Sequence, residues 1–576
     1  TTGDLNVIAG ALAGDALTTG TLNVALGAFA LSSATTPASN VAVGYAALEE
    51  TTTGDNNTGI GFKAGEALTT GIQSTLIGSL AGDALTTGNY NVALGYGALS
   101  SDDVGSRSTA IGHSALFNQN LASATDTYNV AVGHGAGSSI TTGTNNTLIG
   151  GLCGDAMTTA ARNTAVGYAS LTSATSSDNT AVGWASLNSL TTGNANIAIG
   201  RSALQSLSTG GSNIAIGYLA ADAVTTGDNN VAVGASAMGA NTVGDRNVAI
   251  GNNALAVYNP ASDQDSYNVA IGHDAGKAVT TGFDNTLIGG LAGDAITTSN
   301  YNVAVGTRAA TNTTTSAQGV TVVGTDALFT NTTGDDLVAM GRAALYYNST
   351  GAHNVAVGRS ALQANTTASD NTAVGYLAST SNVTGAGTTA VGAQAAQNNT
   401  ANYTTAFGYR AAEQNTSGTA TTALGMESLV SNTTGANNTG VGFQAGLANT
   451  TGGNNTAVGR SALAANTTGA SNTAIGRTAG LALTTGNSNT FVGEGSGVAA
   501  TTSENNTFVG QNSGVAVTTG NRNTVVGRGA AASLQDGSDN VAIGDSITVG
   551  ASLGNSITIG SGISATGSND FSFGKA

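Results

Sequence analysis

A glycine recurs about every 17 residues from Gly10 to Gly544, and this spacing constrains the fold more than any other feature of the sequence. There are 32 of these glycines, which we call marker glycines, and each closes a short segment such as Asn-Val-Ala-Val-Gly at residues 40–44. A unit of 17 residues is too short to bury a core of its own, so each repeat must be stabilised by its neighbours. The period therefore predicts a stack of short, similar turns rather than a set of independent globular domains.

Two longer intervals interrupt this period. The steps from Gly112 to Gly133 and from Gly251 to Gly272 each span 21 residues, whereas the remaining exceptions are steps of 16 or 18. Residues 112–167 also closely match residues 251–306. The simplest interpretation is a tandem duplication of a block of eight repeats.

The residues that precede each marker glycine alternate as in a short β-strand. The residue before the glycine is usually apolar, the residue two positions earlier is Val or Thr, and Ala stands between them in 22 of the 32 repeats. We interpret the branched face as the one buried within the chain, and the small Ala and Gly face as a surface in tight contact with another chain. A sterically crowded bend within one chain is the alternative interpretation of the small face.

A segment related to Thr-Thr-Gly-x-Asn follows the strand, as with Thr-Thr-Gly at residues 18–20. Gly and Asn tolerate a positive φ, so this segment predicts a turn. Stacking would align the Asn and Thr residues of successive repeats into hydrogen-bonded ladders. The marker glycine itself suits a sharp bend or a close approach of two chains.

These patterns predict an all-β fold, a repetitive parallel β-solenoid or β-roll of about 32 coils over residues 1–544. Parallel strands about 4.8 Å apart would give a rod of roughly 150 Å. Residues 545–576 are expected to form irregular C-terminal repeats or a cap that leads into a C-terminal domain absent from this chain. We expect the solenoid to assemble as a homotrimeric fibre.

Composition excludes several classes of partner. The chain contains 15 Lys and Arg residues against 32 Asp and Glu residues, a net charge of −17, which argues against nucleic acid and anionic membrane surfaces. The single cysteine, Cys153, excludes an intrachain disulfide framework, and no apolar run is long enough for membrane insertion. The chain starts within a repeat at Thr1 without Met or a signal peptide, so we expect a fragment or a trimmed product.

The position directly after the marker glycine is the main candidate site, and we call it the stacking column. Eighteen of the 32 repeats place an aromatic residue, His or Arg there, side chains with flat faces that stack on one another. We favour a structural column in a groove or at a chain interface; a linear carbohydrate- or partner-binding stripe anchored by Trp184 is the alternative. The residues are Tyr45, Phe62, Tyr96, His113, His134, Tyr168, Trp184, Arg201, Tyr218, His273, Arg342, Arg359, Tyr376, Tyr409, Phe443, Arg460, Arg477 and Arg528.

Catalytic, metal and cofactor sites are not expected. The histidines of the stacking column lack a recurring carboxylate and nucleophile, and the paired carboxylates Asp102-Asp103 fall in the variable part, where we expect solvated turns. The recurring Gly-Asp pairs do not reproduce the calcium-binding nonapeptide. Cys153 replaces Ala and is expected to be a small buried residue.

The segment Asn-Val-Ala-Val-Gly-Tyr-Ala-Ala-Leu at residues 40–48 resembles the head repeats of trimeric autotransporter adhesins, which carry an Asn-Ser-x-Ala-Ile-Gly signature. The repeat unit of that family is about 14 residues long. The resemblance implies a left-handed parallel β-roll with three chains to a head. The repeats are more similar still to the shafts of long bacteriophage tail fibres. In such fibres a stretch similar to residues 568–576 leads into a C-terminal chaperone domain that is often cleaved after trimerisation.

These resemblances imply a non-enzymatic structural fibre of a phage tail, located on the virion outside the cell, that mediates host attachment. Its partners would be two copies of itself, other virion tail proteins, and a host-surface glycan or protein receptor. The alternative is the head region of a bacterial trimeric surface adhesin. Ice binding would require Thr-x-Thr on a flat strand, whereas here the Thr residues are adjacent, and a depolymerase would require clustered carboxylates that the sequence lacks.

Overall fold

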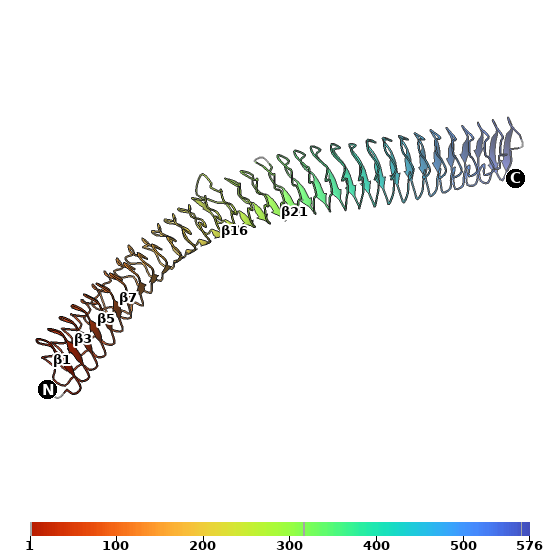
Figure 1. Ribbon diagram of the computed structural model, residues 1–576. Coiled ribbons are helices and arrows are strands. Elements are labelled where there is room, and N and C mark those ends of the chain that lie inside the picture. Colours follow the sequence, from red (N-terminus) through yellow and green to blue (C-terminus); the bar gives the residue numbers. More distant parts are fainter. Residues whose placement is uncertain (1–2, 315–316, 566, 576) are drawn as a thin grey trace. The chain divides into compact units, whose positions relative to one another are not determined.

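The computed structural model describes residues 3–314, 317–565 and 567–575. The chain divides into two compact units, Thr1–Asn285 and Thr286–Ala576. In both units the described residues form strands and turns without helices, in a parallel β-solenoid of about 33 turns with a repeat of about 17 residues (Figure 1). The fold class predicted from the repeat is therefore confirmed.

Unit 1 contributes one short strand from each turn, and the strand of one turn pairs in parallel with that of the next. The register is residue for residue, so Val24, Ala25 and Leu26 pair with Val41, Ala42 and Val43. Its strands are β1 (Val7–Ala9), β2 (Val24–Leu26), β3 (Val41–Val43), β4 (Thr58–Ile60), β5 (Thr75–Ile77), β6 (Val92–Leu94), β7 (Thr109–Ile111), β8 (Val130–Val132), β9 (Thr147–Ile149), β10 (Thr164–Val166), β11 (Thr180–Val182), β12 (Ile197–Ile199), β13 (Ile214–Ile216), β14 (Val231–Val233), β15 (Gly244–Asp245), β16 (Val248–Ile250), β17 (Gln264–Asp265) and β18 (Val269–Ile271).

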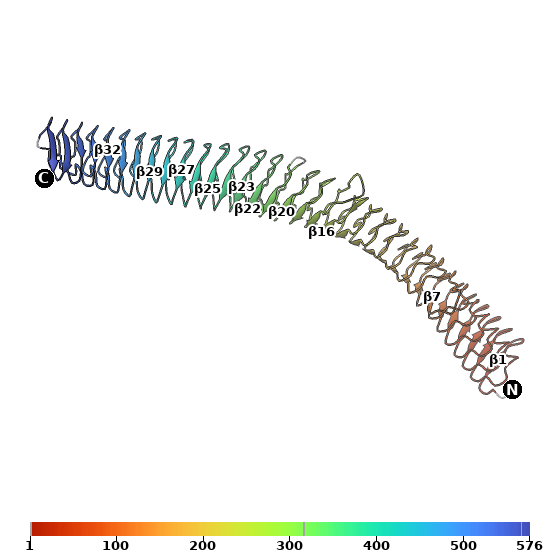
Figure 2. The same ribbon diagram turned by 180° about the vertical axis from the view of Figure 1, so that it is seen from behind.

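Unit 2 repeats the same arrangement, which Figure 2 shows from behind. Its strands are β19 (Thr286–Ile288), β20 (Val303–Val305), β21 (Thr321–Val323), β22 (Val338–Met340), β23 (Val355–Val357), β24 (Thr372–Val374), β25 (Thr389–Val391), β26 (Thr405–Phe407), β27 (Thr422–Leu424), β28 (Thr439–Val441), β29 (Thr456–Val458), β30 (Thr473–Ile475), β31 (Thr490–Val492), β32 (Thr507–Val509), β33 (Thr524–Val526), β34 (Val541–Ile543), β35 (Ile557–Ser561) and β36 (Phe571–Lys575). The last two strands are five residues long.

The core of each turn is built on the small face of the strand. The middle strand residue, such as Ala42, is fully buried, and it packs with residues three, four and seven positions after the marker glycine, such as Ala47, Leu48 and Leu68. The first and third strand residues face outward and are half-buried or exposed. The prediction that the branched face is the buried one, and that the Ala face contacts another chain, is therefore wrong. The small face is internal because the chain closes on that side of the strand, and the same position also accepts larger side chains such as Phe491.

The marker glycine allows successive turns to approach closely. At Gly425 the φ is +133°, and a Cβ atom would lie 2.6 Å from the carbonyl oxygen of Gly442 in the next turn. Only glycine adopts this conformation readily, and a side chain would also meet backbone. The predicted sharp bend is present, whereas the close approach is between successive turns of one chain rather than between two chains.

The turn chemistry differs in detail from the prediction. The glycine of Thr-Thr-Gly is not at positive φ; at Gly20 a Cβ would lie 2.5 Å from the Pro37 carbonyl oxygen, so close approach again explains it. The positive φ values fall instead on residues two and four positions after the marker glycine and five before it, as at Ala46, Leu48 and Ser39. These residues are mostly not glycine, so composition could not locate them.

Candidate binding surfaces

The stacking column forms an exposed row in each unit. All eighteen residues named from the sequence are exposed; Trp184 is 47% and Tyr168 is 52% exposed. The column is ordered because every stacking residue directly follows a marker glycine, and backbone hydrogen bonds join successive turns on either side of it. The sequence thus placed chemically similar side chains one above another along the fibre.

Within the column the rings stack along the fibre. The ring centroids of Tyr45 and Phe62 are 5.5 Å apart with planes 14° from parallel, and His113 stacks between Tyr96 and His134 at 5.2 and 5.1 Å. Arg201 lies between Trp184 and Tyr218, with its guanidinium carbon 5.3 and 5.6 Å from the ring centroids. Stacking on neighbours occupies ring faces, while the side chains stay exposed to solvent.

The column also contains ion pairs between successive turns. Arg477 pairs with Glu494, which takes the place of the stacking residue on the next turn, and Arg528 pairs with Asp545 at 2.9 Å. The hydrogen-bonded guanidinium of Arg528 lowers the pKa of the Asp545 carboxyl from its ordinary value. Both pairs are exposed, so solvent screens them.

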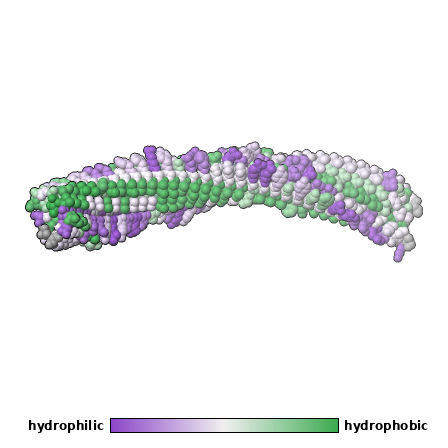
Figure 3. Space-filling model, turned by 60° about the horizontal axis from the view of Figure 1, so that its bottom comes forward, coloured by the Kyte–Doolittle hydropathy of each residue, from purple (hydrophilic) through white to green (hydrophobic). Residues whose placement is uncertain are grey.

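A second surface is the outward strand face, the first and third residues of each strand. Its third residues include exposed large apolar side chains, among them Ile216 in unit 1 at 38% and Phe407 in unit 2 at 55%. Figure 3 shows hydrophobic residues in continuous lengthwise rows. Extended exposed apolar rows are typical of surfaces that contact another molecule.

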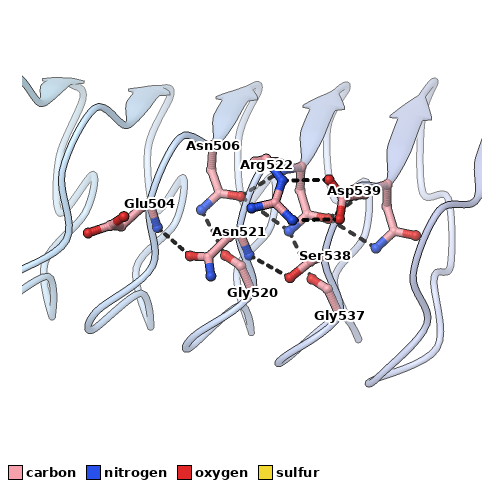
Figure 4. A network of polar contacts seen from close by, with 10 residues as sticks. Glu504, Asn506, Gly520, Asn521, Arg522, Gly537, Ser538 and Asp539 are labelled. Carbon is pink, nitrogen blue, oxygen red and sulfur yellow. Dashed lines mark hydrogen bonds and ion pairs between the residues drawn. The ribbon is translucent and has the colours of Figure 1, made fainter.

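Buried asparagines four positions before the marker glycine form a ladder beneath the surface. In unit 2, Asn506 Nδ2 donates to the Gly520 carbonyl oxygen at 2.9 Å, and Asn506 Oδ1 accepts from the backbone N–H of Asn523 at 2.9 Å (Figure 4). The predicted Asn ladder is confirmed. The Thr ladder is confirmed in a different form, because hydroxyls such as Thr450 Oγ1 donate to the backbone carbonyl of the next turn, here Thr467 at 2.9 Å.

A further column, five positions before the marker glycine, was missed by the sequence analysis. In unit 1, Arg107 lies between the rings of Tyr90 and Tyr128 at 4.8 and 5.7 Å. In unit 2, Arg522 makes two hydrogen bonds to Asp539, at 2.6 and 2.9 Å (Figure 4). The 17-residue spacing of oppositely charged residues at this register was the signal that could have revealed it.

The two 21-residue intervals build local polar structure in unit 1. At the first, Asp102 on the preceding turn is fully buried, and its carboxylate accepts from Nε2 of Gln119 in the interval at 2.6 Å and from the Gly105 N–H at 2.9 Å. Burial raises the pKa of Asp102 above its ordinary value. The expectation of a solvated turn is wrong for this residue, because it stands at the inward-facing position seven residues after Gly95.

The second long interval adds a two-stranded parallel pairing of β15 and β17. Burial, assisted by the carboxyl of Asp263 and the charge of Asp228, raises the pKa of Asp245 to about 6. Arg246 nearby pairs with Asp265 and donates to the Tyr267 hydroxyl at 2.8 Å.

Catalytic groups do not converge in the described part of the chain. It contains no group of three or more His, Cys, Asp or Glu side chains arranged to hold a metal ion. Cys153 is buried beside Ser170 and Ala165, and burial raises the pKa of its thiol to about 11, so the reactive thiolate is scarce. No helix in the described residues is long and apolar enough to cross a membrane.

Comparison with family models and curated proteins gives no function, so a function has to be inferred from these surfaces. None of the protein-family models matches the chain, and a search among curated proteins finds no significant relative.

Proposed function

We propose that three copies of this chain associate through their outward strand faces into a stiff, non-enzymatic fibre. The observation that carries the proposal is the lengthwise apolar row, with residues such as Phe407 and Leu424 exposed on successive turns. Burying such a row against identical rows would remove it from water, at roughly 25 cal/mol per Å² of apolar surface. The trimer axis is thus assigned to the branched face and not to the Ala face.

As a fibre, the assembly would serve as the shaft of a phage tail fibre that extends from the virion and mediates host-surface attachment. The repeat resemblance and the additive stacking of turns support this role, because fibre length follows directly from the number of turns. Its partners would be other virion tail proteins and a host-surface glycan or protein. The head of a bacterial trimeric surface adhesin remains the alternative, since it would use the same architecture on another anchor.

Light scattering on the purified chain tests the assembly. We expect a mass near three times 55.6 kDa, and we expect the double variant Phe407→Asp with Leu424→Asp to weaken association. Ser488→Asp is the matched control, since it adds a charge at the exposed register where Asp539 and Asp370 already stand. A monomeric wild type, or equal weakening by the control, would contradict the proposal.

Immunogold electron microscopy tests the location. Antibodies against the chain should label virion tails. Labelling of a bacterial envelope without virions would instead favour the adhesin.

A further inference from the structure

The arginines of this acidic chain divide into two groups. The chain carries 32 acidic against 15 basic residues, and eight of its arginines pair with a carboxylate. Within the described residues, four arginines make no such pair, although carboxylates are in excess. All four are exposed and belong to the stacking column: Arg201, Arg342, Arg359 and Arg460.

Two of these four stand on neighbouring turns. Strands β22 and β23 pair residue for residue, and the Arg342 carbonyl accepts a hydrogen bond from the Ser360 N–H at 3.0 Å. The backbone positions of Arg342 and Arg359 are therefore one turn apart, about 4.8 Å along the fibre. Like charges at this separation repel unless an anion lies between or beside them.

A second arginine pair in the same column provides an internal comparison. Arg460 and Arg477 also occupy neighbouring turns, but the following turn supplies Glu494, which pairs with Arg477. After Arg342 and Arg359 the following turn supplies Tyr376 instead, whose ring centroid lies 5.7 Å from the Arg359 guanidinium carbon. The column thus supplies a carboxylate to one arginine of the Arg460–Arg477 pair and none to either arginine of the Arg342–Arg359 pair.

The carboxylate of Asp326, on the preceding turn, is already bound. Asp326 accepts two hydrogen bonds from Arg308, at 2.7 and 3.0 Å. The Arg359 guanidinium lies over the Tyr376 ring, and the Arg359 side chain is exposed to solvent. Planar donors held in this way suit bidentate recognition of a carboxylate or phosphate group.

We propose that Arg342 and Arg359 bind successive anionic groups of a linear acidic polysaccharide that lies along the fibre, with Tyr376 contacting a sugar ring. The described residues enclose no pocket, and the donors form a row, so the surface suits a polymer with regularly repeated charge. The charge can come from a carboxylate or a phosphate. This lateral site goes beyond the proposed function, because it needs neither a trimer nor a fibre tip.

Binding of the full chain to three oligosaccharides at low ionic strength tests the site. The probes are an oligogalacturonate, its uncharged methyl ester, and a phosphomannan oligosaccharide. We expect binding of at least one acidic probe, no binding of the ester, and weakening by added salt. The acidic probe that binds identifies the source of the charge.

Four variants make the test specific. Arg359→Gln should weaken binding about tenfold, since it removes the charge-assisted hydrogen bonds of the guanidinium. Tyr376→Glu should also weaken it, by supplying the carboxylate that Glu494 supplies to Arg477. Glu494→Gln should add a second binding site, because it releases Arg477. Arg477→Gln is the matched control and should leave binding unchanged.

Absence of binding to both acidic probes would overturn the inference, as would equal weakening by Arg359→Gln and Arg477→Gln. A loss of trimer mass in Arg359→Gln without glycan binding by the wild type would assign the arginines to a chain interface instead. Failure of the proposed fibre is distinguishable, because a monomer that still binds the acidic probe would contradict the trimer and leave this site standing.

Discussion

Two stretches of the solenoid fill the same buried position with side chains of different chemistry. The inner column, the residue seven positions after the marker glycine, is apolar in the unit 1 stretch Leu190, Leu207 and Val224. In unit 2 the same register holds buried asparagines on nine successive turns: Asn331, Asn348, Asn365, Asn382, Asn399, Asn415, Asn432, Asn449 and Asn466. An apolar column and an amide column therefore fit the same backbone.

One carbonyl group, ten positions after the marker glycine, accepts a side-chain hydrogen bond in both stretches, and on some turns from both registers, as when Asn438 and Asn449 donate to Gly452. In the apolar stretch it accepts from the asparagine ladder, as when Asn213 Nδ2 donates to Gly227 at 2.8 Å. Where that ladder position is Thr421, which has no amide, the inner Asn432 donates to the corresponding carbonyl of Gly435 at 2.9 Å. The buried carbonyl must be satisfied, but either of two registers can provide the donor.

The largest expected effect is common to both stretches and tests whether they share one backbone. Gly217→Ala and Gly425→Ala should each lower the local free energy of unfolding by about 3 kcal/mol or more, because both combine positive φ with a backbone clash. In Gly217 the φ is +142° and the Cβ would lie 2.5 Å from the Gly234 carbonyl oxygen. Native-state hydrogen exchange around each site would measure the loss.

Gly529→Ala is the matched control for both variants. Its φ is +58°, a conformation that Ala46 already adopts at the same register, and only Ser546 Oγ approaches the added Cβ, at 3.9 Å. The expected loss is below about 1 kcal/mol. A large effect in only one of the two marker variants would mean that the stretches differ in backbone as well as in the inner column.

The next prediction compares a turn where only the inner asparagine donates to this carbonyl with a turn where the ladder asparagine donates as well. Asn432→Leu should cost about 2–3 kcal/mol locally, since it removes the side-chain donor to the buried Gly435 carbonyl. Asn449→Leu should cost less, because Asn438 Nδ2 still donates to the corresponding Gly452 carbonyl at 2.7 Å. Hydrogen exchange at Gly435 and Gly452 would measure the loss of local stability in each variant. Equal losses would contradict the view that either asparagine register can supply the donor.

A smaller, pH-dependent effect concerns Asp102, an acidic residue in the inner column of unit 1. Burial raises its pKa, so the folded chain binds more protons than the unfolded chain between the two pKa values. The wild type should therefore gain local stability relative to Asp102→Asn as the pH falls from neutrality, with no further change above the folded-state pKa. Denaturation followed at several pH values would measure the difference, and a gap that widens in the opposite direction would contradict it.

The smallest effect is expected at Cys153. Ala81 and Ala292 are fully buried at the same register, so Cys153→Ala should change stability by less than about 1 kcal/mol. With a thiol pKa of about 11, the folded wild type should resist alkylation at pH 8 and react rapidly in denaturant. Mass spectrometry would follow the reaction, and rapid labelling of the folded chain would show that unit 1 opens at this turn.

The fold could be predicted because the residues that define it recur at a regular spacing in the sequence. The marker glycines, the strand segments and the Asn and Thr columns repeat in register, and stacking converts such a sequence period directly into neighbours in space. The stacking column was located for the same reason. The column five positions before the marker glycine escaped notice because Tyr90, Arg107 and Tyr128 straddle an interval of 21 residues.

The sequence by itself determined the parallel solenoid, its period and the residues that share a column. Only the tertiary structure decided which strand face is internal, because a three-residue strand alternates without indicating the side on which the chain closes. The coil closes over Ala42 since Ala47 and Leu48 already fill its interior, and it leaves Val41 and Val43 outside. The tertiary structure likewise decided which arginines find a carboxylate, since that depends on the side chain presented by the next turn.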